Sequence, residues 1–505
     1  MMRMFGKEKI IYAVVIGIIS IVYVVTAFNS HGYYHADEHY QIVEFAGIKL
    51  GTHKPFEVAW EYEEQVRPTV QPTICFLVIK MFTILDNSNP YWQMFCLRLL
   101  SAVLALTAIG LFVKRTINQF DNKYVRLGYF VLSYLLWFIP YLSVRFASES
   151  WSGLFFLLSL AVLLNNTSEN RKKFFVAGIL IGLAFLFRFQ IASAVVGLCC
   201  WLFFIRKTKI RYFLVLFAAF LLVLLAGTCL DTWFYGRFVF TQWNYFHVNF
   251  IEDKASMFGT SPWYFYLLTL LKSPTYFVGI PVALSIVLLA VFQPKNVYLW
   301  CFIPFFVLHS FIPHKEERFL FPIVYLSPVI LAMAYNQIRV FLQKRMITKV
   351  VSYVLLIAFA VVNLTGVVVV SQKGGGLARM CTTKYIYERY NDRSIRLIWT
   401  VWANPYKPWE GLGSKFYYPH DIEWGGRIEH LGELNDTLIA HDKENLLMIK
   451  KSDLELPDAR ELLRKNHYIF ETQTIPTWML PIINSGYPLS DNHIFCLYRY
   501  NPQSN

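Results

Sequence analysis

Apolar segments of about 20 residues recur through the first three quarters of the chain, separated by short polar loops. A helix of that length matches the hydrocarbon core of a bilayer, so the pattern predicts a helical protein that crosses a membrane many times. The apolar segments lie at residues 10–28, 69–85, 91–113, 127–144, 150–165, 174–187, 190–205, 212–233, 263–292, 296–313, 318–336 and 350–371.

Composition agrees with this interpretation. Of 505 residues, 56% are hydrophobic and 18% are aromatic, and the formal net charge is +14. In a soluble protein such a positive excess would favour nucleic-acid binding. Beside membrane segments, loop cations instead set the orientation of the chain and contact anionic headgroups. We therefore expect membrane lipid as a partner and no nucleic acid.

Clusters of Lys and Arg predict the topology. If all of them face the cytoplasm together with the N-terminus, every alternate loop is extracytoplasmic. All basic loops fall on the same side only if segment 69–85, which follows Pro68 and contains Lys80, does not fully cross the membrane. Whether this segment crosses stays open. The result is about eleven spans with the C-terminus outside. The clusters lie within residues 114–126, 171–173, 206–211 and 339–349 and at Lys295.

A different composition begins after Gly374-Gly375-Gly376. We expect residues 1–371 to form a membrane domain, with a first outer loop at 29–68, and residues 372–505 to form a small α/β domain outside the membrane. Strands are expected at Leu397–Ala403, Leu446–Lys450, Tyr468–Thr474 and Ile494–Tyr500, and helices at Lys384–Tyr390 and Asp458–Lys465.

The most unusual polar stretch is His314-Lys315-Glu316-Glu317-Arg318, between two apolar segments. A charged side chain costs roughly 2.5–3.5 kcal/mol at a bilayer centre, so the pentad is either a solvated turn or a functional site. A plain turn would more usually contain Gly, Asn, Ser and Pro. In the predicted topology the other unusual polar residues share its side of the membrane, which favours a common site.

The residue types suit group transfer from a charged lipid. Asp37 or Glu38, just after the first span, is a candidate general base for an acceptor hydroxyl. Arginine holds phosphate oxygens in a fork, so cations of the outer loops are candidates for binding a phosphate or diphosphate leaving group. These cations are Arg318, Lys315, His314, Arg188, Arg67 and Arg145. Candidate acceptor- or sugar-binding residues are Trp60, Glu61, Tyr62, Gln41, Trp263 and Tyr264.

Each candidate also has a purely structural interpretation. Asp37 and Glu38 are placed to cap a helix running through Ala46, and Glu316 and Glu317 to neutralise the two cations of the pentad. Trp and Tyr near span ends are common as interfacial belts. The spacing of His31, His35, His39 and His314 is not diagnostic of a metal site, so no metal site is predicted and metal dependence stays open.

Several motifs together resemble glycosyltransferase family 22. Residues 314–319 resemble its H-K-E-E-R-F signature, and residues 60–62 match its W-E-[WY]. Residues 231–236 and 258–263 resemble two further stretches of the family. The chain departs from the family at Ala36, usually Pro, and at 188–190, usually R-P-T. The first loop matches the pattern H-x-D-E-x-x-Q-x-x-E through His35, Asp37, Glu38, Gln41 and Glu44.

The resemblance implies a GT-C fold in which the first outer loop carries the catalytic carboxylate. That family comprises α-mannosyltransferases, including the third GPI mannosyltransferase and luminal mannosyltransferases of lipid-linked oligosaccharide synthesis. It implies transfer with inversion from a polyprenyl-phosphate-linked sugar, dolichyl or undecaprenyl, to a glycolipid or glycan acceptor. The departures leave the sugar, the acceptor and the linkage open.

Two alternatives remain. One is a GT-C transferase of another family, moving aminoarabinose or an oligosaccharide. The other is a secondary transporter for an anionic solute, which should show repeats with interrupted helices in matching halves; no such symmetry is visible. Compact loops favour a bacterial inner membrane, with the endoplasmic reticulum as the alternative. In either membrane the site is expected on the extracytoplasmic or luminal side.

Overall fold

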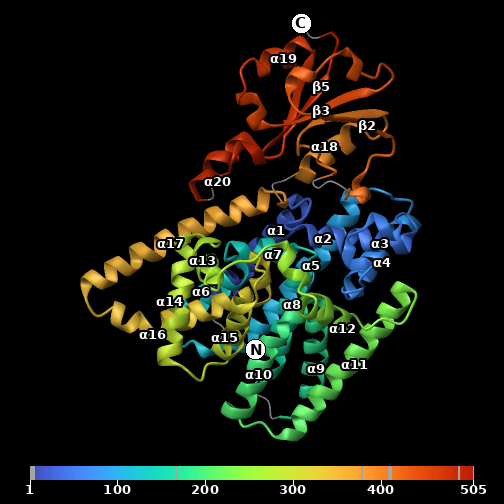
Figure 1. Ribbon diagram of the computed structural model, residues 1–505. Helices are drawn as coiled ribbons and strands as arrows, with labels where there is room; N and C mark the ends of the chain where they lie inside the picture. Colours follow the sequence, from blue (N-terminus) through green and yellow to red (C-terminus); the bar gives the residue numbers. More distant parts are fainter. Residues whose placement is uncertain (1–5, 166–168, 377–378, 408–411, 487–488, 504–505) are drawn as a thin grey trace. The chain divides into compact units, whose positions relative to one another are not determined.

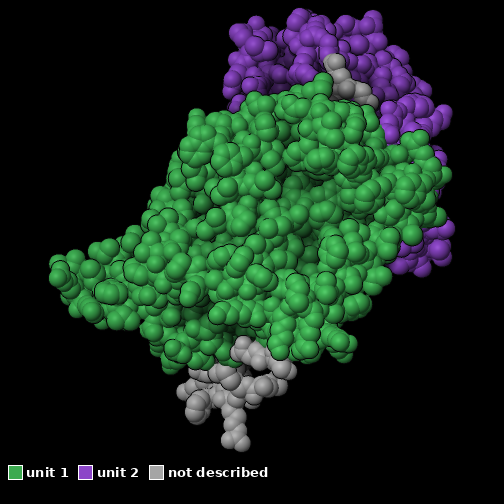
Figure 2. Space-filling view, turned by 60° about the horizontal axis from the view of Figure 1, so that its bottom comes forward, with its two compact units in different colours: residues 1–27, 64–74, 97–371 green, residues 28–63, 75–96, 372–505 purple. Residues whose placement is uncertain are grey.

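The computed structural model describes residues 6–165, 169–376, 379–407, 412–486 and 489–503, and most of them are helical. The chain divides into two compact units (Figure 2). Unit 1 comprises residues 1–27, 64–74 and 97–371. Unit 2 comprises residues 28–63, 75–96 and 372–505, so the first outer loop belongs to the same unit as the C-terminal region.

Apolar helices of six to 27 residues make up most of unit 1 (Figure 1). Three of them, α1, α4 and α5, also extend into unit 2. The helices are α1 (Gly6–Asn29), α4 (Val70–Ile84), α5 (Pro90–Thr116), α6 (Lys123–Leu135), α7 (Phe138–Val144), α8 (Ser148–Leu163), α9 (Arg171–Phe187), α10 (Ala192–Cys200), α11 (Ile210–Tyr235), α12 (Thr241–Phe246), α13 (Phe265–Lys272), α14 (Tyr276–Phe292), α15 (Val297–Phe311), α16 (Ser327–Leu342) and α17 (Met346–Gln372).

Five helical stretches of the described chain are long and apolar enough to cross a membrane. Two further helix pairs qualify when taken together, α6 with α7, bent by 45°, and α14 with α15, bent by 120°, which raises the count to seven. A multi-pass membrane protein is thus confirmed, while the number eleven stays a prediction. The five stretches are Ile10–Asn29, Pro90–Gln119, Ile210–Tyr235, Glu317–Leu342 and Met346–Gln372.

Two apolar segments are less regular than their hydropathy indicates. Segment 263–292 is divided between α13 and α14, because Pro274 lacks a backbone N–H and Thr275 takes a positive φ of 67°. Segment 318–336 begins as a 3-10 helix over Glu317–Leu326, which contains Pro322. A Cβ at Gly153 of α8 would lie 2.4 Å from the Pro322 carbonyl oxygen, so this glycine lets the 3-10 helix approach α8 closely.

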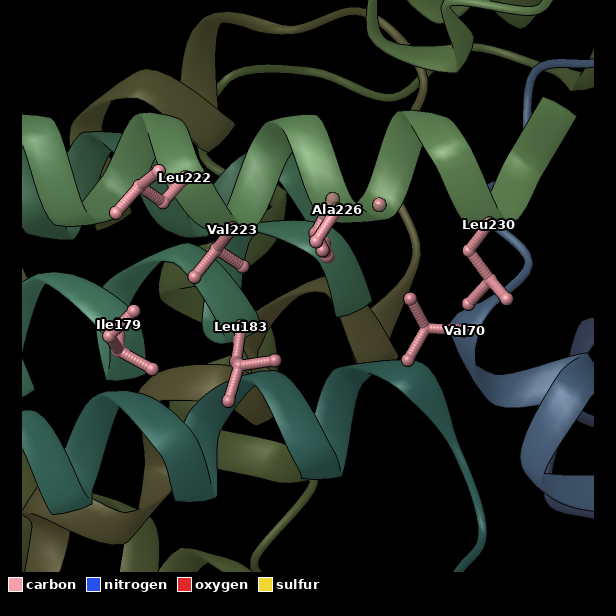
Figure 3. Close-up of a pocket in the computed structure, with 9 residues that line it drawn as sticks. Val70, Ile179, Leu183, Leu222, Val223, Ala226 and Leu230 are labelled. Atoms are coloured by element: carbon pink, nitrogen blue, oxygen red, sulfur yellow. The ribbon is translucent and has the colours of Figure 1, made fainter.

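Small residues also allow α9 and α11 to pack side by side (Figure 1). A Cβ at Gly178 would lie 2.3 Å from the Leu216 carbonyl oxygen, which is the close helix approach typical of membrane proteins. Between the two helices lies a groove of about 300 Å³ (Figure 3). Its lining is aliphatic throughout, including Ile179, Leu183 and Leu230.

In unit 2 a mixed five-stranded sheet has the order β2-β1-β3-β5-β4. Strand β1 is parallel to β2 and β3, whereas β5 is antiparallel to β3 and β4. The other elements are α2 (Ala36–Tyr40), α3 (Val43–Leu50), α18 (Arg379–Tyr390), α19 (Ala459–Lys465) and α20 (Leu480–Gly486). The strands are β1 (Ile395–Thr400), β2 (Ile422–Ile428), β3 (Glu444–Lys450), β4 (Tyr468–Gln473) and β5 (Phe495–Tyr500).

The small C-terminal sheet domain is therefore confirmed, with the four expected strands shifted by at most two residues at their starts. Strand β2 was not expected. It contains Gly425 and Gly426, lies at the sheet edge, and lacks the alternation of buried and exposed side chains that marks a strand in sequence.

Candidate active site

The two candidate carboxylates of the first loop lie in the first turn of α2. The backbone N–H of Tyr34 donates to Glu38 Oε2 at 2.8 Å, so Glu38 helps to close the loop. The Asp37 side chain is 22% exposed and lies 3.5 Å from His35 Nδ1. The capping interpretation thus holds for their position in a first turn, but the helix ends at Tyr40, and Ala46 belongs to α3, which begins at Val43. The role of Asp37 as proton acceptor stays a prediction.

Beneath this loop lies a buried carboxylate, Glu44, only 1% exposed. His39 Nε2 lies 2.6 Å from Glu44 Oε1, and His53 Nε2 pairs with the other oxygen. The Phe416 backbone N–H also donates to Oε1, at 3.3 Å. Burial alone would raise the pKa of Glu44, but the two imidazoles lower it to about 2. Glu44 is therefore a charged anchor that the sequence motif contains but that was not singled out as a site residue.

Aromatic packing fixes one of these imidazoles. The His39 ring stacks against Tyr33 and Tyr417, with centroid distances of 5.3 and 5.4 Å. Ser414 Oγ lies 3.0 Å from Tyr40 Oη, so segment 414–417 of the C-terminal region contacts α2 at both His39 and Tyr40. This segment therefore supports the helix that carries Asp37.

The structure brings together two of the predicted acceptor-binding residues. Gln41 Nε2 donates to Glu61 Oε1 at 2.7 Å, and both side chains are buried. Trp60 and Tyr62 flank Glu61 in a 3-10 helix, and the Tyr62 ring packs edge-to-face on the Phe45 ring. Trp263, by contrast, belongs to unit 1 and is 61% exposed.

In unit 1 the carboxylate of Glu149 joins two predicted phosphate-binding arginines. Arg318 Nη1 lies 3.0 Å from Glu149 Oε1, and Arg188 Nη2 lies 3.3 Å from the same oxygen. Both guanidinium groups also lie over the Phe319 ring, at 5.3 and 5.2 Å from its centroid. All three charged side chains are buried, so they form one desolvated ionic cluster.

A second carboxylate, Glu316, extends this cluster into the pentad. It pairs with Arg318 Nε, and its Oε1 lies 3.0 Å from His314 Nε2. The other ring nitrogen of His314 lies 2.9 Å from the Gly259 carbonyl oxygen. An acceptor beside each ring nitrogen favours the protonated form of the imidazole, which donates from both nitrogens. The bond to Glu316 accordingly raises the pKa of His314.

The ammonium group of Lys315 points to backbone carbonyls. Its Nζ donates to Ser261 O at 2.8 Å and to Ile312 O at 2.5 Å, and burial lowers its pKa. In this conformation Lys315 fastens loop 259–263 to the end of α15. A contact between Lys315 and phosphate stays a prediction.

Of the remaining predicted cations, Arg67 lies close enough to Arg188 for the two charges to interact. The Arg67 guanidinium lies 6.0 Å from the Tyr245 ring centroid, and Gln190 Nε2 donates to Tyr245 Oη at 2.8 Å. Buried Asp231 steadies this region by accepting the N–H and hydroxyl of Thr69, each at 2.7 Å. Arg145 is fully buried, with its guanidinium 5.6 Å from the ring centroid of Tyr141.

The cluster around Glu149 concentrates buried cations. Arg188 and Arg318 pair with the Glu149 carboxylate, and Arg318 and His314 pair with Glu316. In addition, Arg188 Nε is buried and has no acceptor among the described residues. A buried donor without an acceptor is costly and rare in folded proteins. The cluster therefore offers an anion two buried guanidinium groups and the Nε donor of Arg188.

No group of three or more His, Cys, Asp or Glu side chains within the described ranges has the geometry to hold a metal ion. His39 and His53 direct their Nε2 atoms at the Glu44 carboxylate. His31 Nε2 lies 3.3 Å from Lys384 Nζ.

Comparison with known proteins gives several relatives of similar name. GPI mannosyltransferase 3 of Candida albicans is 26% identical over 305 residues, which are 59% of this chain and 58% of that protein. GPI alpha-1,2-mannosyltransferase 3 of Xenopus laevis is 23% identical over 314 residues, 60% of this chain and 56% of that protein. The chain thus spans a little over half the length of these relatives.

A shorter match has a higher identity. The probable Dol-P-Man:Man(7)GlcNAc(2)-PP-Dol alpha-1,6-mannosyltransferase of Schizosaccharomyces pombe is 30% identical over 184 residues, 35% of this chain and 32% of that protein. Among solved structures, ArnT from Cupriavidus metallidurans bound to undecaprenyl phosphate matches with a TM-score of 0.56 and 9% identity. The alignment covers 99% of this chain and 100% of ArnT, so the two proteins share the GT-C fold.

A family model gives the broadest match. The model of the Alg9-like mannosyltransferase family aligns with residues 14–407, which contain both the acidic loop and the arginine cluster. The expected family resemblance is confirmed. The chain belongs to the Alg9-like mannosyltransferase family.

Proposed function

We propose that this protein is a membrane-embedded α-mannosyltransferase. It moves mannose from a polyprenyl phosphate donor to a hydroxyl of a glycolipid or glycan acceptor, with inversion at the anomeric carbon. The observation that carries the proposal is the Glu149 cluster, where two buried arginines share one carboxylate oxygen and Arg188 Nε has no acceptor among the described residues.

A lipid phosphate suits this cluster chemically. Arginine presents a planar fork of donors that matches two phosphate oxygens, and burial strengthens each of these charge-assisted bonds. The Schizosaccharomyces pombe relative carries Dol-P-Man in its name, and ArnT was solved with undecaprenyl phosphate. Both names support a polyprenyl phosphate donor here. Arg188 and Arg318 are its primary ligands, with His314, Lys315 and Arg67 around them.

The reaction needs one proton acceptor and one stabilised leaving group. Asp37 takes the proton of the acceptor hydroxyl while that oxygen bonds to the anomeric carbon from the face opposite the phosphate. The bond between the anomeric carbon and the phosphate oxygen breaks, and its electron pair stays on the lipid phosphate. Arg318 and Arg188 stabilise the charge that develops on this phosphate. Gln41 and Glu61 orient the acceptor, with Trp60, Tyr62 and Trp263 as candidate stacking surfaces for sugar.

The membrane arrangement is part of the proposal. Residues 1–371 form the catalytic domain with about eleven spans, and residues 372–505 form an extracytoplasmic domain. The site faces the extracytoplasmic or luminal side, with a bacterial inner membrane favoured over the endoplasmic reticulum. Single cysteines placed near Arg171 and near Thr260 should label from opposite sides of sealed vesicles. Labelling from the same side would contradict this topology.

The activity itself is tested by a transfer assay. Purified protein is supplied with polyprenyl phosphate mannose, with the corresponding glucose or aminoarabinose lipids, and with a panel of glycolipid acceptors. We expect a mannosylated lipid product of α configuration, no product with Asp37→Asn, and little product from the other donors. Transfer of aminoarabinose in preference to mannose would contradict the proposal and favour the alternative donor class.

A further inference from the structure

A second cavity in unit 1 contains none of the candidate active-site residues. It measures about 270 Å³ and lies where the last turns of α5 and α8 meet the first turns of α9. Unlike the aliphatic groove between α9 and α11 in Figure 3, its lining combines aliphatic and cationic side chains.

Cationic and aliphatic side chains are ordered along the two helices that form the cavity wall. Arg115 in the last turn of α5 is four residues from Leu111, and Lys172 in the first turn of α9 is four residues from Val176. Residues four apart lie on the same face of a helix. Each helix therefore contributes a cation at its end and an aliphatic side chain one turn further in, where Leu158 of α8 completes the apolar wall.

No carboxylate lines this cavity in the described part of the chain. The acidic residue of the adjoining loop, Glu169, is already engaged, 3.3 Å from Arg206 Nε and accepting from Thr208 Oγ1 at 2.8 Å. A third lining cation, Lys173, is buried and donates to the Asn165 carbonyl oxygen at 2.7 Å. Arg115 and Lys172 thus keep an uncompensated positive charge at the mouth of an apolar pocket.

We propose that this cavity binds an anionic phospholipid, with the headgroup phosphate between Arg115 and Lys172 and one acyl chain against Leu111, Leu158 and Val176. The order of the lining matches the order of a lipid, with charge at the membrane surface and hydrocarbon one helical turn deeper. A soluble phosphate ester would match only the cations and leave the aliphatic wall in contact with water.

This lipid site lies at the opposite end of the helical hairpin that carries part of the arginine cluster. Glu149 is in the first turn of α8 and Arg188 directly follows α9, where Ser152 Oγ also donates to the Ala184 carbonyl oxygen at 2.8 Å. The lipid site is near Asn165 and Lys172, about 24 Å away along α8 by helix rise. A bound lipid would hold the free end of the α8–α9 hairpin at the membrane surface and so reduce its motion.

Lipid retention tests the proposal independently of transferase activity. The protein is reconstituted in nanodiscs of phosphatidylglycerol and phosphatidylcholine in equal amounts, and retained lipids are counted by native mass spectrometry. Wild type should keep one phosphatidylglycerol in preference to phosphatidylcholine. The double variant Arg115→Ala/Lys172→Ala should lose this lipid by about tenfold or more. Leu111→Trp, which fills the cavity but keeps both cations, should lose it as well.

A matched control removes the same charge from basic loops outside the cavity. Lys123→Ala/Lys209→Ala should retain phosphatidylglycerol like wild type, and thermal unfolding in detergent checks that every variant is folded. Glycerol 3-phosphate should not displace the lipid at millimolar concentration. Retention by Arg115→Ala/Lys172→Ala at the control level would overturn the site. Full displacement by glycerol 3-phosphate would overturn the lipid assignment.

Discussion

Glu149 in unit 1 and Glu44 in unit 2 are both buried carboxylates held by two cationic partners, but the partners differ. Arg188 and Arg318 hold Glu149, and their guanidinium groups are charged at every accessible pH. His39 and His53 hold Glu44 through single ring nitrogens, each directed at one carboxylate oxygen. One cluster is built on forked guanidinium donors, whereas the other is built on single imidazole contacts.

The two clusters also differ in what their buried polar atoms face. Both oxygens of Glu44 lie against imidazoles, Oε1 beside His39 and the Phe416 backbone N–H, and Oε2 in an ion pair with His53. In the arginine cluster a guanidinium nitrogen, Arg188 Nε, is buried without an acceptor among the described residues. A cluster whose ionic groups all face one another supports the structure around it. A cluster with a spare buried donor is suited to bind an anionic ligand. We therefore assign binding to the Glu149 cluster and positioning to the Glu44 cluster.

The largest effect is expected at Asp37, which the Glu44 cluster supports. Asp37→Asn keeps the shape of the side chain and removes the proton acceptor, so turnover should fall about 10²–10⁴-fold. Steady-state kinetics with polyprenyl phosphate mannose measures this, and the donor KM should change little. Glu38→Gln serves as the comparison, because that carboxylate bonds the Tyr34 backbone. An inactive Glu38→Gln beside a normal Asp37→Asn would show that the roles are exchanged.

A smaller effect is expected for Arg318→Lys. Arg318 pairs with Glu149 and Glu316 through separate nitrogens, Nη1 and Nε. Lysine keeps the charge but has a single nitrogen, so it cannot hold both carboxylates and also bind phosphate. Affinity for a non-hydrolysable polyprenyl phosphate analogue should fall roughly 10–100-fold, as for loss of one charge-assisted bond. Arg318→Ala should lose more. Arg427→Lys, in an exposed pair with Glu429, is the matched control and should be silent. Unchanged affinity in Arg318→Lys would contradict phosphate binding.

Glu44→Gln tests the positioning role. The amide keeps the size of the carboxylate but leaves two buried imidazoles without their anion, which should lower turnover roughly tenfold through misplacement of α2. Hydrogen exchange over residues 35–50 should increase at the same time. Glu57→Gln removes an exposed carboxylate paired with Lys415 in the same unit and should change neither quantity. Normal turnover and normal exchange in Glu44→Gln would contradict the role.

The smallest effect concerns acid stability. The pKa of Glu44 is about 2 in the folded protein, below the ordinary value of 4.5, so the folded state favours its charged form. Its contribution to stability is complete above pH 4.5 and is lost as pH falls toward 2. Thermal unfolding of wild type should therefore weaken over this window more than that of Glu44→Gln. Parallel acid profiles for the two proteins would show that Glu44 is not charged in the folded state.

Sequence patterns predicted local features better than long-range pairings. Apolar segments gave the membrane character, and alternating strands gave most of the C-terminal sheet. The Glu149 hub was not predicted, because its partners are distant along the chain. Arg188 is 39 positions from Glu149, and Arg318 is 169 positions from it. A signal existed, since an acid at the start of an apolar helix is seldom buried without a partner. The Glu44 contacts to His53 and Phe416 carried no comparable signal, because Phe416 takes part through its backbone.

The most direct test of the account measures donor binding and turnover separately in one variant from each cluster. Arg318→Lys and Glu44→Gln are compared with wild type in nanodiscs, with affinity for the non-hydrolysable polyprenyl phosphate analogue as one readout and mannose transfer at saturating donor as the other. The account predicts that Arg318→Lys loses affinity, whereas Glu44→Gln binds the analogue normally and loses turnover. Normal binding by Arg318→Lys, or equal loss of binding in both variants, would contradict the division between a binding cluster and a positioning cluster.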